Sequence, residues 1–279
     1  VEARTSWLQA HLLVRHAASM DWELVHAVDG AIVLPADGPA ASLQPPRHPR
    51  HGPFDQRLGY VRVPHFVDRL GTRGYVLTHQ AYFSPALAEH VAQGRFPPYH
   101  EKTRAGLRIE GCRAEHLYSF DYPFATYKRF DEVPAVVVNA LLFIENRELL
   151  DASRPWMNPA VDWKRFGRAL IAQAARVVDE DLDAPGGSTL ATQIEKYRHS
   201  PDGVTPEPRE KLRQMISASV RAYRDGRETL PFRRQLVLDY LNTVPLSAAP
   251  VHGEVHGLGD GLWVWFGADF ARVNALLAE

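Results

Sequence analysis

Apolar and polar positions divide the chain into a mixed first part and a strongly helical second part. Helical periodicity over residues 3–28 is followed by a stretch rich in proline, glycine and histidine, 34–54, whose composition is typical of a loop or linker. Residues 57–70 predict a short strand and then a helix. A second group of breaking residues, FPPYHEK at 96–102, predicts a domain boundary, which we place after residue 105.

The second part is predicted to begin with two short strands and to continue as helices. Residues 106–120 predict strands on either side of a turn at Gly111. Residues 133–144 are almost all apolar, and a helix that is apolar all round is normally buried. Further amphipathic helices are predicted over 161–178, 208–225 and 233–246. We therefore expect a mostly α domain over residues 106–279, preceded by a smaller α+β region over residues 1–105.

The composition of the 279 residues excludes some classes of function. Hydrophobic residues make up 45% and charged residues 23%, as in ordinary globular proteins, and a net charge of −1 gives no overall positive field for nucleic acid. Cys112 is the only cysteine, which rules out a disulfide within the chain and a cysteine-based metal cluster. The chain has no apolar run of about 18 residues, the length that a transmembrane helix needs.

Both ends of the chain suggest a longer protein. The first residue is Val1, and the final stretch, FARVNALLAE, has the pattern of a helix that stops partway. We expect the C-terminal domain to be truncated and a signal or anchor segment to lie outside this chain.

Glu145 is the first candidate for chemistry because it directly follows the apolar run. A carboxylate that leaves a buried apolar wall is poorly solvated, and poor solvation raises a carboxyl pKa towards the range of a general base. The alternative, which this position alone favours, is a glutamate at a helix end that faces water.

Residues 186–196, GGSTLATQIEK, have the composition of an anion-binding turn. The glycines let the backbone approach a ligand closely, and the Ser-Thr pair can cap the following helix, whose first N–H groups would face an anion. The glutamine and the lysine can share one side of that helix. An ordinary capped helix after a turn explains these residues equally well. The candidate ligand-binding residues are Gly187, Ser188, Thr189, Gln193 and Lys196.

The helix predicted over 208–225 has a cationic flank beside its apolar stripe. Lys211 and Arg213 could bind phosphate oxygens, and Gln214 belongs to the same flank. A solvated helix face is the commoner explanation of such a pattern.

Two groups near the C-terminus carry weaker signals. Trp263, Trp265 and Phe266 could bind sugar, but such a run is more often core packing. His252 and His256 are four residues apart, as zinc ligands can be, but no third ligand accompanies them. We therefore predict no metal ligands.

Taken in order, six segments resemble motifs of the peptidoglycan glycosyltransferases, glycosyltransferase family 51, which occur in bifunctional penicillin-binding proteins and monofunctional transglycosylases. The family's IPxxVxxAxxxIEDRxF corresponds to VPAVVVNALLFIENREL, its GVDWxxxxRA to AVDWKRFGRA, and its GGSTxTQQxxK to GGSTLATQIEK. Its RKxxEaxxA corresponds to EKLRQMISA at 210–218, its ILxxYLNxxxxG to LVLDYLNTVPLS, and its closing YFGK-type element to WVWFGAD. The resemblance covers about residues 106–279.

This resemblance implies a lysozyme-like, mostly α fold with a membrane-contacting lobe. It implies that glycan strands are polymerised from lipid II, a disaccharide-peptide carried on a polyprenyl pyrophosphate, so that the anion at the GGST turn would be the pyrophosphate. Glu145 would remove the proton from the acceptor's 4-hydroxyl, whose oxygen attacks the donor's anomeric carbon with inversion. The second motif (Ser188, Thr189, Gln193 and Lys196) and the cations of the third (Lys211 and Arg213) would bind the substrate.

The same resemblance implies partners and a location. The partners would be lipid II, the growing glycan strand and a membrane surface, with other cell-wall synthesis proteins as further candidates and no nucleic acid. The domain would work in the bacterial cell envelope, on the outer face of the cytoplasmic membrane. The resemblance implies no cofactor, and it leaves open a divalent cation such as Mg²⁺ at the pyrophosphate.

The chain departs from the family pattern at several positions. Asn146 replaces the usual Asp, Leu149 the usual Phe, and Thr192 the first Gln of a pair; about six residues are inserted before Val161. Gln214 stands where the family has its second glutamate, and an amide cannot hold a proton or supply negative charge to a metal.

Alternative functions therefore stay open. The chain is either an active polymerase, in which Glu145 works alone or with a substitute such as Glu148, Glu195 or Asp183, or a degenerate module that binds lipid-linked precursor or glycan without turnover. A glycan-cleaving, lysozyme-like hydrolase fits less well, because hydrolysis needs no pyrophosphate site and most sugar hydrolases use two carboxylates.

Overall fold

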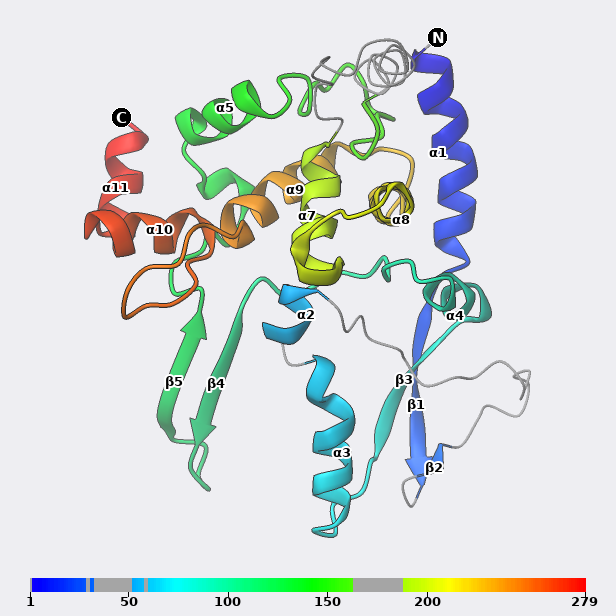
Figure 1. The fold of residues 1–279 in the computed structure, drawn as a ribbon, viewed down its shortest axis with the longest axis vertical. Coiled ribbons are helices and arrows are strands. Elements are labelled where there is room, and N and C mark those ends of the chain that lie inside the picture. Colours follow the sequence, from blue (N-terminus) through cyan, green and yellow to red (C-terminus); the bar gives the residue numbers. More distant parts are fainter. Residues whose placement is uncertain (1, 29–30, 33–51, 58–59, 163–187) are drawn as a thin grey trace. The chain divides into compact units, whose positions relative to one another are not determined.

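The structure is a computed structural model, and it describes residues 2–28, 31–32, 52–57, 60–162 and 188–279 (Figure 1). The chain forms two compact units. Unit 1 comprises Val1–Tyr99 and Glu195–Arg227, and unit 2 comprises His100–Ile194 and Glu228–Glu279. Helix α7 (Leu190–His199) begins in unit 2 and ends in unit 1.

Unit 1 combines a small antiparallel sheet with helices. Its strands are β1 (Trp22–Val28), β2 (Ala31–Ile32) and β3 (His79–Phe83), in the order β2-β1-β3, with Trp22 paired to Phe83 and His26 to His79. Its helical elements are α1 (Glu2–Ala18), α2 (Pro53–Arg57), η1 (Tyr60–Arg62), α3 (Val63–Gly71), α4 (Pro85–Ala92), the end of α7, η3 (Pro201–Gly203) and α8 (Pro208–Ala222).

The core of unit 1 joins the sheet to α1, α4 and α8. Met20, Phe83, Leu87 and Val220 are buried together in one apolar cluster. Ser84 caps α4 by accepting a hydrogen bond from the Leu87 N–H, and it also donates to the Ser19 carbonyl. This serine therefore fixes the chain between α1 and β1 against the start of α4.

Two predictions in this unit are wrong. The helix expected over 3–28 ends at Ala18, because the residues from Trp22 onward pair with β3 in a sheet that local periodicity does not reveal. The strand expected at the start of 57–70 is absent from the described residues there. These form η1 and then α3, in which Pro64 occupies the first turn, a position that suits proline.

Unit 2 begins with the predicted hairpin. Strands β4 (Ala105–Glu110) and β5 (His116–Tyr122) flank the turn at Gly111, which confirms the prediction for 106–120. Leu107 pairs with Phe120 and Ile109 with Tyr118, so these four side chains share one face. The remaining elements are η2 (Phe130–Glu132), α5 (Ala135–Ile144), the start of α7, α9 (Leu230–Thr243), α10 (Gly257–Phe266) and α11 (Phe270–Leu277).

Side-chain to backbone hydrogen bonds connect these helices. Asn242 on α9 accepts from the Tyr127 N–H at 2.9 Å and donates to the Tyr127 carbonyl at 2.8 Å, as a paired strand would. Asp260 on α10 accepts from the backbone N–H groups of Phe124 and Ala125. A Cβ at Gly259 would lie 2.3 Å from the Ala125 carbonyl oxygen, so only glycine allows this approach.

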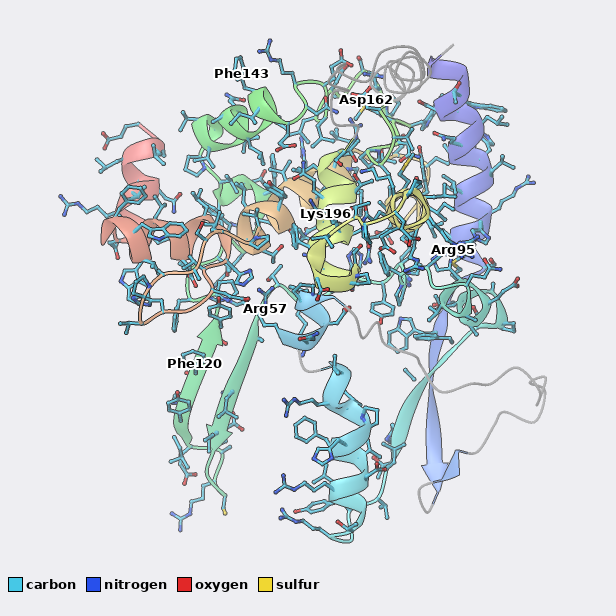
Figure 2. The ribbon with its side chains drawn as sticks, viewed as in Figure 1. Arg57, Arg95, Phe120, Phe143, Asp162 and Lys196 are labelled. Carbon is cyan, nitrogen blue, oxygen red and sulfur yellow. The ribbon has the colours of Figure 1, made fainter. Side chains whose placement is uncertain are left out.

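Helix α5 differs from its prediction. Val138 and Leu142 are buried, but Phe143 and Ile144 are 65% and 75% exposed (Phe143 is labelled in Figure 2). Among the described elements α5 packs along one side, where it contacts α11, and an all-apolar sequence does not reveal which sides will be covered. The expected burial all round is therefore wrong.

The other helical predictions have mixed outcomes. Helices α8 and α9 confirm those over 208–225 and 233–246, and the described part of the second half is mostly α, as expected. The helix predicted over 161–178 lies outside the described residues, except for its first two positions. None of the described helices combines the length and the apolarity needed to cross a bilayer.

Candidate active site

Glu145 lies at the C-terminal end of α5 in unit 2. Its N–H donates to the Leu141 carbonyl, and its side chain is partly buried. The Gln193 side chain, from the first turn of α7, donates from Nε2 to Glu145 Oε2 at 2.6 Å. The fold therefore joins the candidate base of the first motif to the glutamine of the second, which are 48 residues apart in sequence.

Tyr240 on α9 extends this contact. Its hydroxyl lies 3.4 Å from Gln193 Oε1, so the amide oxygen faces Tyr240 while the amide nitrogen faces Glu145. Burial raises the pKa of Tyr240, and the negative charge of Glu145 raises it further. Tyr240 is the tyrosine of the YLN motif and was not among the candidate residues predicted from the sequence.

The start of α7 is capped by a reciprocal pair of threonines. Thr189 Oγ1 accepts from the Thr192 N–H at 3.3 Å, and Thr192 Oγ1 accepts from the Thr189 N–H at 3.0 Å. This is the arrangement of a capping box, with threonine in place of the usual Glu or Gln. Thr192, a departure from the family pattern, thus has a structural role. Ser188 is partly buried, and Gly187 lies outside the described residues.

The loop after Glu145 is held by polar contacts. Asn146 Oδ1 accepts from the Glu148 N–H at 3.0 Å, a turn that the usual Asp could also make. Arg233, fully buried on α9, donates to backbone carbonyls of this loop. The carbonyls belong to Leu149 at 2.7 Å, Asp151 at 3.1 Å and Arg154 at 2.9 Å. Sequence reasoning missed Arg233, because nothing local distinguishes it from Arg234.

The candidate cations lie in unit 1. Lys196 is on α7 (Figure 2) and Lys211 is on the first turn of α8. The pKa of Lys211 is lowered from 10.5 to about 8, first by burial and then by the positive charge of Lys196. Two cations close enough to repel one another, in a partly desolvated position, form a site that an anion would stabilise.

Arg213 and Gln214 follow on α8. Arg213 Nη1 forms an ion pair with Glu210 Oε2 at 2.8 Å. Gln214 is fully buried, and its Nε2 donates to Ser200 Oγ and to Thr205 Oγ1, each at 2.9 Å. The amide at the position of the family's second glutamate is therefore part of a buried hydrogen-bond network within unit 1.

The suggested substitutes for the second glutamate are engaged elsewhere. Glu195 is buried and receives hydrogen bonds from Arg221, the shorter at 2.8 Å. Glu148 pairs with Arg154. Asp183 lies outside the described residues.

The C-terminal aromatic residues do not form a core. Trp263 and Trp265 are each more than two-fifths exposed and Phe266 is 77% exposed, so the expected core packing is wrong. His252 packs edge-on against Trp263, and His256 Nε2 lies 3.2 Å from Glu254 Oε2. The described part of the chain contains no group of three or more His, Cys, Asp or Glu side chains placed to hold a metal.

Unit 2 places the Glu145 carboxylate beside the Gln193 amide, and unit 1 carries two neighbouring lysines suited to an anion. A sequence model of the transglycosylase family matches residues 115–277, more than half of the chain, and the chain belongs to this family. Its transglycosylase domain is lysozyme-like, and the family acts in peptidoglycan glycosyl transfer in the cell envelope. A search among curated proteins finds no match. The division at residue 105 stays a prediction.

Proposed function

We propose that this chain polymerises glycan strands from lipid II and that Glu145 is the general base. The observation that supports this proposal is the 2.6 Å hydrogen bond between Gln193 Nε2 and Glu145 Oε2. It orients a partly exposed carboxylate with residues from two of the family's motifs, as general-base catalysis requires.

The proposed step transfers the donor glycan to the acceptor with inversion. The acceptor's 4-hydroxyl gives its proton to Glu145, and its oxygen forms a bond to the anomeric carbon of the donor. The bond between that carbon and the pyrophosphate oxygen breaks, and the polyprenyl pyrophosphate leaves with the electron pair. Lys196, Lys211 and Arg213 would stabilise the charge that develops on the leaving group.

The protein's own cations carry this role in the proposal, without a metal. The acidic side chains nearest to the cations in sequence are Glu195 and Glu210, and each is bound by an arginine. These residues do not fit a Mg²⁺ site, because an arginine already occupies the carboxylate that a Mg²⁺ ion would need. We therefore assign no step to a divalent cation.

We further propose that the domain works at a membrane surface, where lipid II and the growing strand would meet it. Phe143 and Ile144 directly precede Glu145, and both are largely exposed. Exposed apolar side chains beside the candidate base suit a substrate whose carrier is a polyprenyl chain. The outer face of the cytoplasmic membrane would be the location, and other cell-wall synthesis proteins would be further partners.

The test is incubation of the protein with labelled lipid II in liposomes, followed by separation of polymer from monomer. A ladder of glycan strands with release of polyprenyl pyrophosphate is the expected result. Saturable binding of lipid II without polymer would instead support the degenerate binding module. Shortening of preformed strands would support the hydrolase, and the absence of binding and turnover would overturn the proposal.

A further inference from the structure

Ser200, which directly follows α7, is the centre of a buried polar network in unit 1. Its hydroxyl donates to Glu210 Oε1 at 2.6 Å and accepts from Gln214 Nε2 at 2.9 Å. Ser200 and Gln214 are completely buried, and Glu210 is 6% exposed. A serine hydroxyl has one proton, and here that proton goes to Glu210.

The network explains why an amide occupies position 214. Gln214 donates to Ser200 and to Thr205, and a carboxylate at this position could donate to neither. Glutamate there would also place a second buried carboxylate against Ser200, whose single proton cannot serve two acceptors. Two carboxylates that share one site cannot both ionise without a large cost.

The second oxygen of Glu210 holds Arg213. Glu210 Oε2 pairs with Arg213 Nη1 at 2.8 Å, while the guanidinium packs over Gly94. A Cβ at Gly94 would lie 3.3 Å from Arg213 Nη2 and 3.4 Å from Cζ, so the glycine leaves just enough room. Gly94 also has a φ of +78°, which favours glycine. The orientation of Arg213 is therefore set from two sides.

The acidic residue of the motif RKxxEaxxA stands at a different position in this chain. Its first residue corresponds to Glu210 and its fifth to Gln214, so this chain has its carboxylate one helical turn earlier on α8. We propose that Glu210 is the acidic positioning residue of this helix, that Gln214 is its hydrogen-bond complement, and that the pair orients Arg213 towards the substrate diphosphate. The last part rests on the proposed function. Glu210 then supplies the carboxylate that position 214 lacks, and Gln214 is not a sign of lost activity.

The first test is Glu210→Gln, which keeps the size of the side chain and an oxygen that can accept from Ser200. Loss of the ion pair releases Arg213, so we expect kcat for lipid II polymerisation to fall about tenfold, the factor that about 1.4 kcal/mol represents. The affinity for inorganic pyrophosphate should stay the same or rise, because a negative charge has been removed. A merely structural role would lower kcat and affinity together, and an unchanged kcat would overturn the proposal.

The second test exchanges the two side chains. Gln214→Glu alone should lower the unfolding midpoint by about 2–8 °C, as expected for burying an uncompensated carboxylate in a chain of this size. Adding Glu210→Gln should restore the midpoint, since one carboxylate and one amide again share Ser200. A double variant no more stable than Gln214→Glu would contradict the network.

A third measurement does not depend on turnover. In wild type, the Arg213 Nη1–H protons, which face Glu210, should exchange slowly with solvent in NMR spectra recorded at low temperature, and in Glu210→Gln they should exchange faster. Arg213→Lys identifies the resonance. If the wild-type protein makes no polymer, the proposed function fails, but the midpoints and the Arg213 exchange still decide whether the network exists. Equal exchange in the two proteins would overturn the assignment of Glu210.

Discussion

Glu145 and Glu210 are carboxylates of the two units, and the protein holds them in different ways. Glu145 is partly exposed at a helix end, follows two exposed apolar residues, and accepts a hydrogen bond from a neutral amide. Glu210 is buried inside α8, accepts from Ser200 and pairs with Arg213. The contact between Gln193 and Glu145 is with a neutral donor, whereas the contact between Arg213 and Glu210 is with a positive charge.

This difference separates two roles. One oxygen of Glu210 is engaged by Ser200 and the other by Arg213, in a side chain that is buried, so Glu210 is poorly placed to remove a proton from a sugar. A neutral amide orients the carboxylate of Glu145 without adding a full positive charge. Both glutamates lie within segments that resemble family motifs, so the motifs alone do not show which of them is the base. Their contacts do: Glu145 is the candidate base, and Glu210 is a positioning residue.

Removing the basicity of Glu145 should have the largest effect. Glu145→Gln keeps the shape and removes the proton acceptor, so we expect polymerisation to fall by about 10²–10⁴-fold, the usual contribution of a general base. Binding of lipid II should change little. The measurement is single-turnover formation of the first glycosidic bond.

Glu148→Gln is the matched control for that variant. Glu148 lies three residues further along, is mostly exposed, and pairs with Arg154 at the surface. An exposed pair contributes about 0–1 kcal/mol, so polymerisation should change less than fivefold. If Glu145→Gln has no more effect than this control, the two carboxylates do not differ as proposed.

The pH dependence of Lys211 gives an effect of intermediate size. Because its pKa is lowered to about 8, its positive charge is mostly present at pH 7 and is lost as the pH rises through 8. Anion binding that requires the charged form should weaken about tenfold between pH 7 and pH 9. The measurement is calorimetric titration with a diphosphate at several pH values.

The variant Lys211→Arg distinguishes the titration of the protein from the titration of the ligand in this experiment. Arginine keeps its charge throughout the range, whereas the diphosphate titrates identically with both proteins. The affinity of the variant should change with pH only as the protonation of the diphosphate changes. Identical pH profiles would show that Lys211 does not bind the anion.

Local signals made part of the fold predictable. The hairpin at Gly111 and helices α8 and α9 have periodic patterns and breaking residues at their ends, and each appears near its predicted bounds. β1 was missed because its pairing with β3 joins residues some 60 positions apart. The exposure of α5 depends on neighbours that its own sequence does not specify.

The sequence predicted individual residues of the candidate site but not the contacts between them. Glu145 and Gln193 were selected by motif, but their hydrogen bond joins residues 48 positions apart, which local patterns do not bring together. The need for an amide at Gln214 follows from Ser200 and Glu210, which the sequence alone does not bring together. A change that looks like the loss of a carboxylate can therefore be part of a network that preserves one.

The smallest expected effect is the most direct test of the geometry around Glu145. The pKa of Tyr240 is raised by burial and then by the charge of Glu145, so Glu145→Gln should lower it. Tyr127 is the control in the same unit: burial raises its pKa, a hydrogen bond to Asn274 opposes this, and Glu145 has no part in it. Selective ¹³C labelling of tyrosine would allow both to be followed by NMR as the pH is raised. A Tyr240 titration that does not move relative to Tyr127 would mean that the two side chains are not neighbours, and the Glu145–Gln193–Tyr240 arrangement would be wrong.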